Sequence, residues 1–159
     1  MTPRKEIFIK VKEALMTISQ LELVDFNRNQ FESEKFPKLL VAALISIPGV
    51  QYESMTEEGQ IGTAEVAVTL YCRDGWRDQH NGTTDPEHGL IEIDLLDEIA
   101  EKLQFLYGDN FAPLQQTNDE EQEVDMSGMF AYKQTFDTRI KRKIGRKYTT
   151  RSITHEKDI

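Results

Sequence analysis

Apolar positions recur at helical spacing in two parts of the chain. The first stripe consists of Ile7, Val11, Leu15 and Ile18. It predicts a helix from about Pro3 to Thr17, with Thr2 as its N-cap. The second stripe consists of Leu96, Ile99, Leu103 and Leu106, broadened by Leu95 and Ala100. It predicts a helix that begins at Asp85-Pro86-Glu87 and ends at Gly108, because a glycine commonly takes the left-handed backbone conformation that ends a helix.

Strict alternation of apolar and polar residues predicts strands elsewhere. The clearest strands cover 61–72 and 130–140. Their inward positions are Ala64, Val66, Val68, Leu70 and Cys72 in the first, and Phe130, Tyr132, Phe136 and Ile140 in the second. Shorter strands are expected at 21–26, at 50–55 and from 111 to 115. The strand at 50–55 is expected to form an antiparallel hairpin with 61–72.

The run from Leu39 to Ile47 is apolar on all sides, so its periodicity does not separate a buried strand from a short buried helix. Its β-branched residues favour a central strand. Pro48-Gly49 then predicts a turn. The acidic and polar stretch from Thr117 to Asp125 is expected to be an exposed loop or a sheet edge.

These elements predict an α+β fold in the order α-β-β-β-α-β-β. We expect a mostly antiparallel sheet of about four to six strands with two helices packed on it. A length of 159 residues fits one domain. We assign it to residues 1–141, followed by a basic and flexible C-terminal arm at 142–159.

Charge is unevenly distributed along the chain. The net charge is −9, yet the segment from Arg139 to Arg151 holds seven basic residues and no acidic one. Such an arm could contact nucleic acid phosphates, dock on an acidic neighbour or stay solvated. Trp76, in the polar loop from Asp74 to Thr84, is either tucked under that loop or used at an interface. The candidate interface residues are Trp76, Arg77, Arg139, Lys141, Arg142, Lys143, Arg146 and Lys147.

No spacing of His, Cys, Ser, Asp or Glu matches a known reaction. The loop that holds His80 and His88 has carboxylates beside them, but its spacing matches no metal motif and a solvated loop explains it better. Cys72 reads as a buried core thiol. We therefore expect no catalytic, metal or cofactor-binding residue, and no enzyme. The N-terminus lacks the apolar segment of a signal peptide and the longest apolar run is too short to cross a bilayer, so a cytoplasmic protein is expected.

With these elements in order, the chain resembles the tail terminator, or tail completion, proteins of long-tailed phages and prophage elements. The resemblance covers most of 3–141, and neighbouring head–tail joining proteins share a similar order. The residues that carry it are Leu23-Val24-Asp25-Phe26-Asn27 with Gln30-Phe31, Phe36 to Val41, Ala64 to Cys72, Leu103 with Leu106-Tyr107-Gly108, and Ala131 to Phe136.

The resemblance implies a structural virion protein without a catalytic site. Proteins of this type form a ring, usually of six copies, that caps the tail tube and joins it to the head. The expected partners are other copies of the chain, tail tube and neck proteins, and DNA that passes through the lumen without specific binding. The protein would then occupy the host cytoplasm during assembly and the virion afterwards, with no membrane partner. The alternative is a nucleic-acid-binding accessory protein of a mobile element that uses the basic arm.

Overall fold

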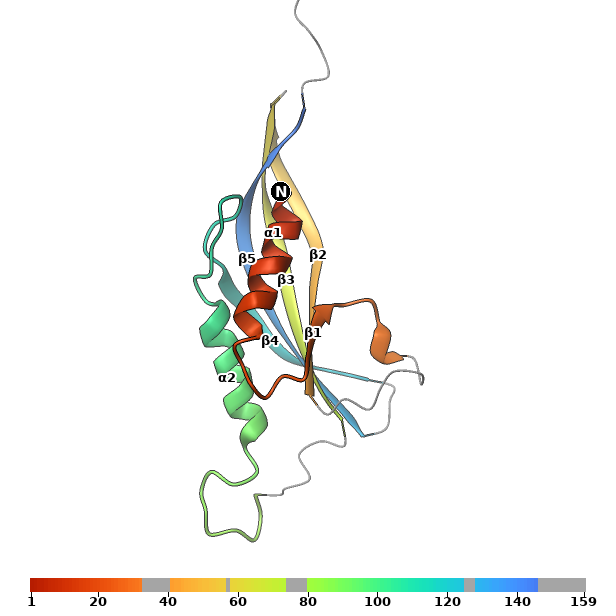
Figure 1. Cartoon of the computed structure of the whole chain (residues 1–159), viewed down its shortest axis with the longest axis vertical. Coiled ribbons are helices and arrows are strands. Elements are labelled where there is room, and N and C mark those ends of the chain that lie inside the picture. Colours follow the sequence, from red (N-terminus) through yellow and green to blue (C-terminus); the bar gives the residue numbers. More distant parts are fainter. Residues whose placement is uncertain (33–40, 57, 74–79, 125–127, 146–159) are drawn as a thin grey trace, which may run out of the picture.

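A computed structural model describes residues 1–32, 41–56, 58–73, 80–124 and 128–145 (Figure 1). Its elements are α1 (Pro3–Leu15), β1 (Leu23–Phe26), the 3-10 helix η1 (Gln30–Glu32), β2 (Val41–Met55), β3 (Gly59–Arg73), α2 (Ile91–Leu103), β4 (Gln115–Gln122) and β5 (Met129–Lys143). Over these ranges five strands form one sheet in the order β1-β2-β3-β5-β4. Only β1 runs parallel to its neighbour. The predicted fold class and element order are confirmed.

One face of the sheet carries the main core. The predicted inward residues of β3, from Ala64 to Cys72, are all buried, and the apolar stripes of α1 and α2 pack against them. Phe136 and Ile140 of β5 join the same core. Gln134, buried beside them, donates a hydrogen bond from Nε2 to the backbone oxygen of Leu96 at 3.0 Å, which ties β5 to α2. The period-2 pattern therefore placed the core face correctly. We call it the covered face.

The opposite face, which we call the open face, is mostly polar. Its apolar part is a small cluster at the β1 end of the sheet, made of Phe31, Ala42 and Leu44 with partly buried Leu23, Tyr71 and Met129 around them. Farther along, β3 and β5 present Glu65, Asp137 and Arg139 on this face. The sheet therefore has one apolar side and one largely polar side, as an antiparallel sheet commonly has.

Strand β2 is longer than predicted and has a bulge in its middle. The strand interpretation of the run up to Ile47 is confirmed from Val41 onward, while residues 39 and 40 lie outside the described part. The turn predicted at Pro48-Gly49 is wrong, because the strand continues through both residues to Met55. The register with β3 shifts between Ser46 and Gly49. A bulge leaves room for a proline, which lacks the N–H that a regular ladder needs.

Helix α1 ends at Leu15, two residues before the predicted end, whereas both predicted ends of α2 are wrong. Residues 81–90 contain turns and irregular backbone rather than helix, and the Asp85 side chain accepts a hydrogen bond from the backbone of Glu87 at 3.0 Å. Gly89 has φ of 75°, so helical geometry starts only after it. At the other end, the helix stops at Leu103 and Phe105 takes the left-handed conformation that we expected of Gly108.

The last two strands also differ in extent from the prediction. No strand starts at Phe111, which forms a single bridge to Ile140, and β4 begins at Gln115. The acidic stretch is an edge strand rather than a loop as far as Gln122. Strand β5 runs on to Lys143, so Arg142 and Lys143, the first two residues of the predicted arm, lie in the sheet.

Candidate assembly surfaces

Four of the candidate interface residues lie together at one end of the sheet. There the β2–β3 hairpin and the last residues of β5 project beyond the N-terminal end of α1 (Figure 1). We call the group Arg139, Lys141, Arg142 and Lys143 of β5 the basic end. Because side chains alternate along a strand, Arg139, Lys141 and Lys143 point to the open face and Arg142 points to the covered face. The remaining candidates, Trp76, Arg77, Arg146 and Lys147, lie outside the described residues.

The two arginines of the basic end are held by contacts within the chain. Nη2 of Arg139 lies 2.9 Å from Oε2 of Glu53 on β2. The guanidinium of Arg142 lies 4.8 Å from the ring centroid of Tyr52 and donates a hydrogen bond to the buried Gln60. Both arginines thus join β5 to the hairpin, and a cation–π contact adds to the second.

The two lysines of the basic end are free for other contacts. Lys141 and Lys143 are exposed, and neither forms an ion pair with the residues that the structure describes. Their register partners on β3 are Ile61 and Gly59. Ile61 itself is 38% exposed, which is unusual for a large aliphatic side chain in a central strand. This end of the open face therefore combines unpaired positive charge with exposed apolar surface.

An acidic surface lies on β4, the edge strand at the other side of β5. We call Asp119, Glu120, Glu121 and the following Glu123 the acidic edge, and all four are exposed. Asp119 lies near Tyr132 of β5, where its negative charge, burial of the ring and a hydrogen bond together raise the pKa of Tyr132. Charged residues along an exposed edge discourage uncontrolled pairing of its free backbone groups with other chains.

Two aromatic side chains that the sequence analysis did not propose as interface residues lie exposed in the loop 104–114. Phe105 is 62% exposed and Tyr107 is 66% exposed. Phe105 has φ of 64°, a rare conformation for a bulky residue. Its backbone N–H donates to the oxygen of Leu114 at 2.8 Å, and the N–H of Leu114 donates back to Leu106 at 2.9 Å. The loop thus presents its aromatic residues from a hydrogen-bonded frame, a setting typical of interface residues.

A buried carboxylate on α1 fixes the tip of this loop. Oε1 of Glu6 accepts from the backbone N–H of Asp109 at 2.7 Å. Oε2 accepts from the backbone and the side-chain amide of Asn110 at 3.0 and 2.7 Å. Burial alone raises the pKa of Glu6, but these hydrogen bonds and the charge of Lys10 outweigh it and hold the pKa below the usual 4.5. Glu6 is therefore an anionic anchor at neutral pH.

Gly108 makes this anchor possible because there is no room for a side chain. A Cβ there would lie 2.4 Å from Oε1 of Glu6 and 2.5 Å from Cε1 of Phe111. The glycine that we predicted as a helix end is thus required by close packing instead. The sequence held a signal for the two exposed aromatic residues. Phe105 and Tyr107 alternate with the inward Leu106 just before a glycine.

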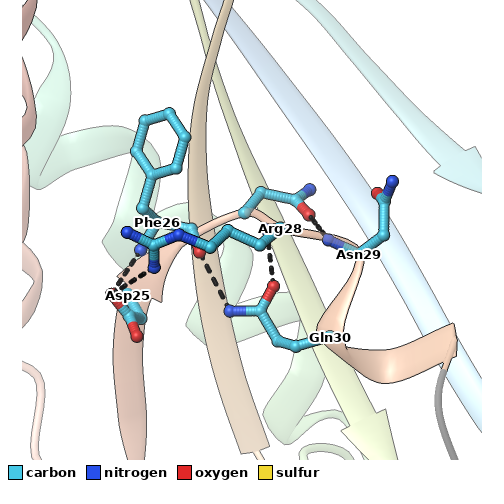
Figure 2. Close-up of polar contacts among 6 residues, drawn as sticks. Asp25, Phe26, Arg28, Asn29 and Gln30 are labelled. Atoms are coloured by element: carbon cyan, nitrogen blue, oxygen red, sulfur yellow. Dashed lines mark hydrogen bonds and ion pairs between the residues drawn. The ribbon is translucent and has the colours of Figure 1, made fainter.

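Figure 2 shows the turn that follows β1, in the part of the sequence that carries the tail terminator resemblance. Nε2 of Gln30 donates to the backbone oxygen of Phe26 at 2.9 Å, and its Oε1 accepts from the N–H of Arg28 at 2.6 Å. The guanidinium of Arg28 lies 5.5 Å from the Phe26 ring centroid and 3.9 Å from Asp25. Asn29 is left-handed, with φ of 55°. Gln30 thereby closes a defined turn at the β1 edge of the sheet.

The residues considered for chemistry are dispersed or buried. Nδ1 of His80 lies 2.8 Å from the backbone oxygen of His88, so the second imidazole is not its partner. Among the described residues, no three His, Cys, Asp or Glu side chains gather as a metal site would require. Cys72 is buried as predicted. Burial, with a smaller contribution from the charge of Glu92, raises the pKa of its thiol to about 12.

The fold has a counterpart among solved structures. No protein-family model and no curated protein matches the sequence. A chain from a structure described as the virion of a native gene transfer agent (GTA) particle superposes with a TM-score of 0.60 at 10% sequence identity. The match covers 85% of this chain and 94% of that chain. It shows that the two chains share a fold. In the described part of this chain, no helix is long and apolar enough to cross a membrane.

Proposed function

We propose that this chain is a structural protein of a phage or phage-like virion. The observation that carries the proposal is the shared fold with a chain of the GTA virion, because the match extends over nearly all of that chain. A fold can host several functions, so surface features have to support the assignment. Here the exposed aromatic loop, the basic end and the acidic edge are features of a protein that binds other proteins.

Within the virion we propose the role of a tail terminator, a ring of copies that caps the tail tube and joins it to the head. This finer assignment rests on the sequence resemblance. Part of that resemblance, residues 23–27 with Gln30 and Phe31, includes the turn that Gln30 closes through its hydrogen bonds to the backbone of Phe26 and Arg28. Expected partners are further copies of the chain, tube proteins and neck proteins. A net charge of −9 suits a ring whose lumen passes DNA without gripping it.

The test is electron microscopy of particles produced when the gene is deleted from its parent element. A tail terminator predicts overlong or headless tails, and a plasmid copy of the wild-type gene should restore normal particles. Normal and infectious particles without the gene would contradict the proposal. A plasmid copy that carries a stop codon early in the gene is the matched control for expression effects.

The alternative is nucleic acid binding through the basic arm, and the observation that favours it is the unpaired state of Lys141 and Lys143 among the described residues. It predicts DNA binding that weakens steeply with salt. The test variant changes Lys141 and Lys143 to Glu and should lose this binding. It keeps the full chain length, because Ile144 donates a backbone hydrogen bond to Glu58 at 3.1 Å. Absence of binding at low salt would exclude this alternative.

A further inference from the structure

We propose that copies of this chain associate head to tail, with the basic end of one copy on the acidic edge of the next. The inference rests on the proposed function in one respect, because it names the surfaces through which a ring of copies would close. The occupant of both surfaces is a second copy of the same chain. The argument uses Lys141 and Lys143 on one side and Glu121 and Glu123 on the other.

The first step is that the basic end has positive charges without an ion-pair partner among the described residues. Arg139 and Arg142 are engaged with Glu53 and with Gln60 and Tyr52, so they shape the surface. Lys141 and Lys143 share the open face with Arg139 and have no ion pair among the described residues. Their strongly hydrated ammonium groups make little contribution to the fold there, and they leave the sheet end positively charged.

The second step is that the acidic edge lacks compensating charge. Lys133 of β5 lies opposite Glu120 in the register, but Asp119, Glu121 and Glu123 have no basic residue in a corresponding position. Strand β4 is also the last strand of the sheet, so its outer backbone groups face away from the chain's other strands. This surface therefore suits a positively charged partner that approaches the sheet from its edge.

The third step is that the two surfaces cannot meet within one copy. Strand β5 gives the distance between them, because Glu121 lies opposite Tyr132 of β5 and Lys143 is the last residue of that strand. At about 3.3 Å per residue, the separation along the strand is roughly 36 Å. A rigid strand keeps them apart, so only another molecule can bring them together. Two different surfaces that match each other form a heterologous contact, which closes a ring when the rotation between copies permits.

Exposed apolar side chains lie at the basic end and between the two surfaces, where a second copy would cover them. Ile61 lies opposite Lys141 and is exposed at the basic end. Phe105 and Tyr107 are exposed in the loop before β4, which lies between the two surfaces. Gln104 accepts a hydrogen bond from the backbone of Gln116 at the start of β4, and Asn110 accepts one from the backbone of Lys141. Charges alone would give a weak and transient contact in physiological salt, whereas buried aromatic residues supply most of the affinity at typical interfaces.

The experiment measures the mass of the purified full chain by sedimentation velocity at low and at high salt. The test variants are Lys141→Glu with Lys143→Glu, Glu121→Lys with Glu123→Lys, and the combination of all four changes. We expect oligomers of the wild type that dissociate as salt rises. Each reversed pair should weaken association by about 100-fold or more, because like charges then face each other. The combined variant should recover the wild-type state, since both surfaces have exchanged signs.

Matched controls change the same charges elsewhere. Lys5→Glu with Lys102→Glu, and Glu13→Lys with Asp97→Lys, alter exposed residues of the two helices and should leave association unchanged. Thermal melting of every variant separates lost association from lost folding. Glu120 is left unchanged because Lys133 lies opposite it.

Three outcomes would overturn the inference: a wild type that stays monomeric at low salt, test variants that associate as the wild type does, or a combined variant that is not restored. Each is distinguishable from failure of the proposed function. Overlong tails in the deletion, together with unaltered association of the reversed pairs, would leave the tail terminator role standing and reject these surfaces. Normal particles together with a restored combined variant would reject the role and keep the surfaces.

Discussion

The covered face and the open face of the sheet are built from alternate residues of the same strands, yet their contents differ sharply. On the covered side, Val66 and Val68 of β3 are fully buried beneath the helices. Between and beside these valines, the open side has the small Ala67, which is itself buried, and the exposed Glu65. The comparison teaches that stability is concentrated on one side of the sheet. The other side has exposed charged positions, such as Glu65 and Arg139, that can meet other molecules.

The open face even tolerates an arrangement that opposes folding. Glu65 of β3 lies directly opposite Asp137 of β5. Two carboxylates in that position repel each other, and like charges directly opposite are destabilising. On the covered face, Gln134 is paired through its Nε2 with the backbone oxygen of Leu96, while its buried Oε1 has no partner among the described residues.

The largest effect should follow a charge placed on the covered face. Val68→Asp buries a carboxylate between Ile45 and Gln134, where it has no cationic partner. We expect a loss of about 4–5 kcal/mol or more of unfolding free energy, sufficient to unfold a typical domain. Circular dichroism and chemical denaturation measure this change.

The matched control for that variant is Thr63→Asp on the open face of the same strand, opposite Arg139. Its stability should change by no more than about 0.5 kcal/mol. A folded Val68→Asp protein with unchanged melting would show that the assignment of the two faces is wrong.

A smaller loss should follow removal of the Glu6 anchor beside the covered face. Glu6→Gln replaces one acceptor oxygen with a donor against the N–H groups of Asp109 and Asn110. We expect a loss of about 2–4 kcal/mol at neutral pH. Urea denaturation as a function of pH measures it.

The pH dependence of the unfolding free energy gives a second test of the Glu6 prediction. Because the folded pKa of Glu6 lies below 4.5, its contribution is present above that value and disappears as pH falls through the folded pKa. The difference between wild type and Glu6→Gln should therefore shrink in acid. A difference that stays constant at low pH would show that the carboxylate charge is not the cause.

Gly108→Ala should be the next smaller change. Its Cβ would collide with Glu6 and Phe111, and the loop must shift to admit it, at a cost of about 1–3 kcal/mol. Gly49→Ala is the matched control, because nothing lies within 4 Å of a Cβ at that position. Equal melting temperatures for the two variants would contradict the close packing at Gly108.

The smallest effect, with opposite sign, belongs to the open face. Glu65→Lys places a positive charge opposite Asp137 and should stabilise the chain by about 0.2–1 kcal/mol. Glu65→Lys combined with Asp137→Lys recreates repulsion and should remove the gain. If the single variant is no more stable than the wild type, cross-strand repulsion does not limit this face.

The sequence predicted best where a regular period met a buried surface. Alternation in β3 and helical spacing in α1 were both confirmed, since a shift of one residue would expose the whole apolar set. The sequence predicted boundaries poorly where one residue type is used in two kinds of local structure. Asp85 forms a turn rather than a helix cap, and Pro48 occupies a bulge rather than a turn. Local sequence does not distinguish these uses.

The candidate surfaces were predictable only in part. The basic residues of β5 were identified from charge alone, but their division into two engaged arginines and two free lysines depends on partners from β2 and β3. The role of Glu6 depends on Asp109 and Asn110, which are far away in the sequence. The parallel pairing of β1 with β2 is likewise a long-range property that no local pattern encodes.

The position of β5 has a consequence for how the molecule is made. This last strand lies between β3 and β4, pairing Gly59 with Lys143 and Arg73 with Met129. During synthesis, the β2–β3 hairpin therefore leaves the ribosome long before the strand that completes its other side. Until then β3 has an unprotected edge beside an apolar surface, a state prone to aggregation. Such distant pairing slows folding, so timely production of this chain should depend on chaperones that shield the waiting hairpin.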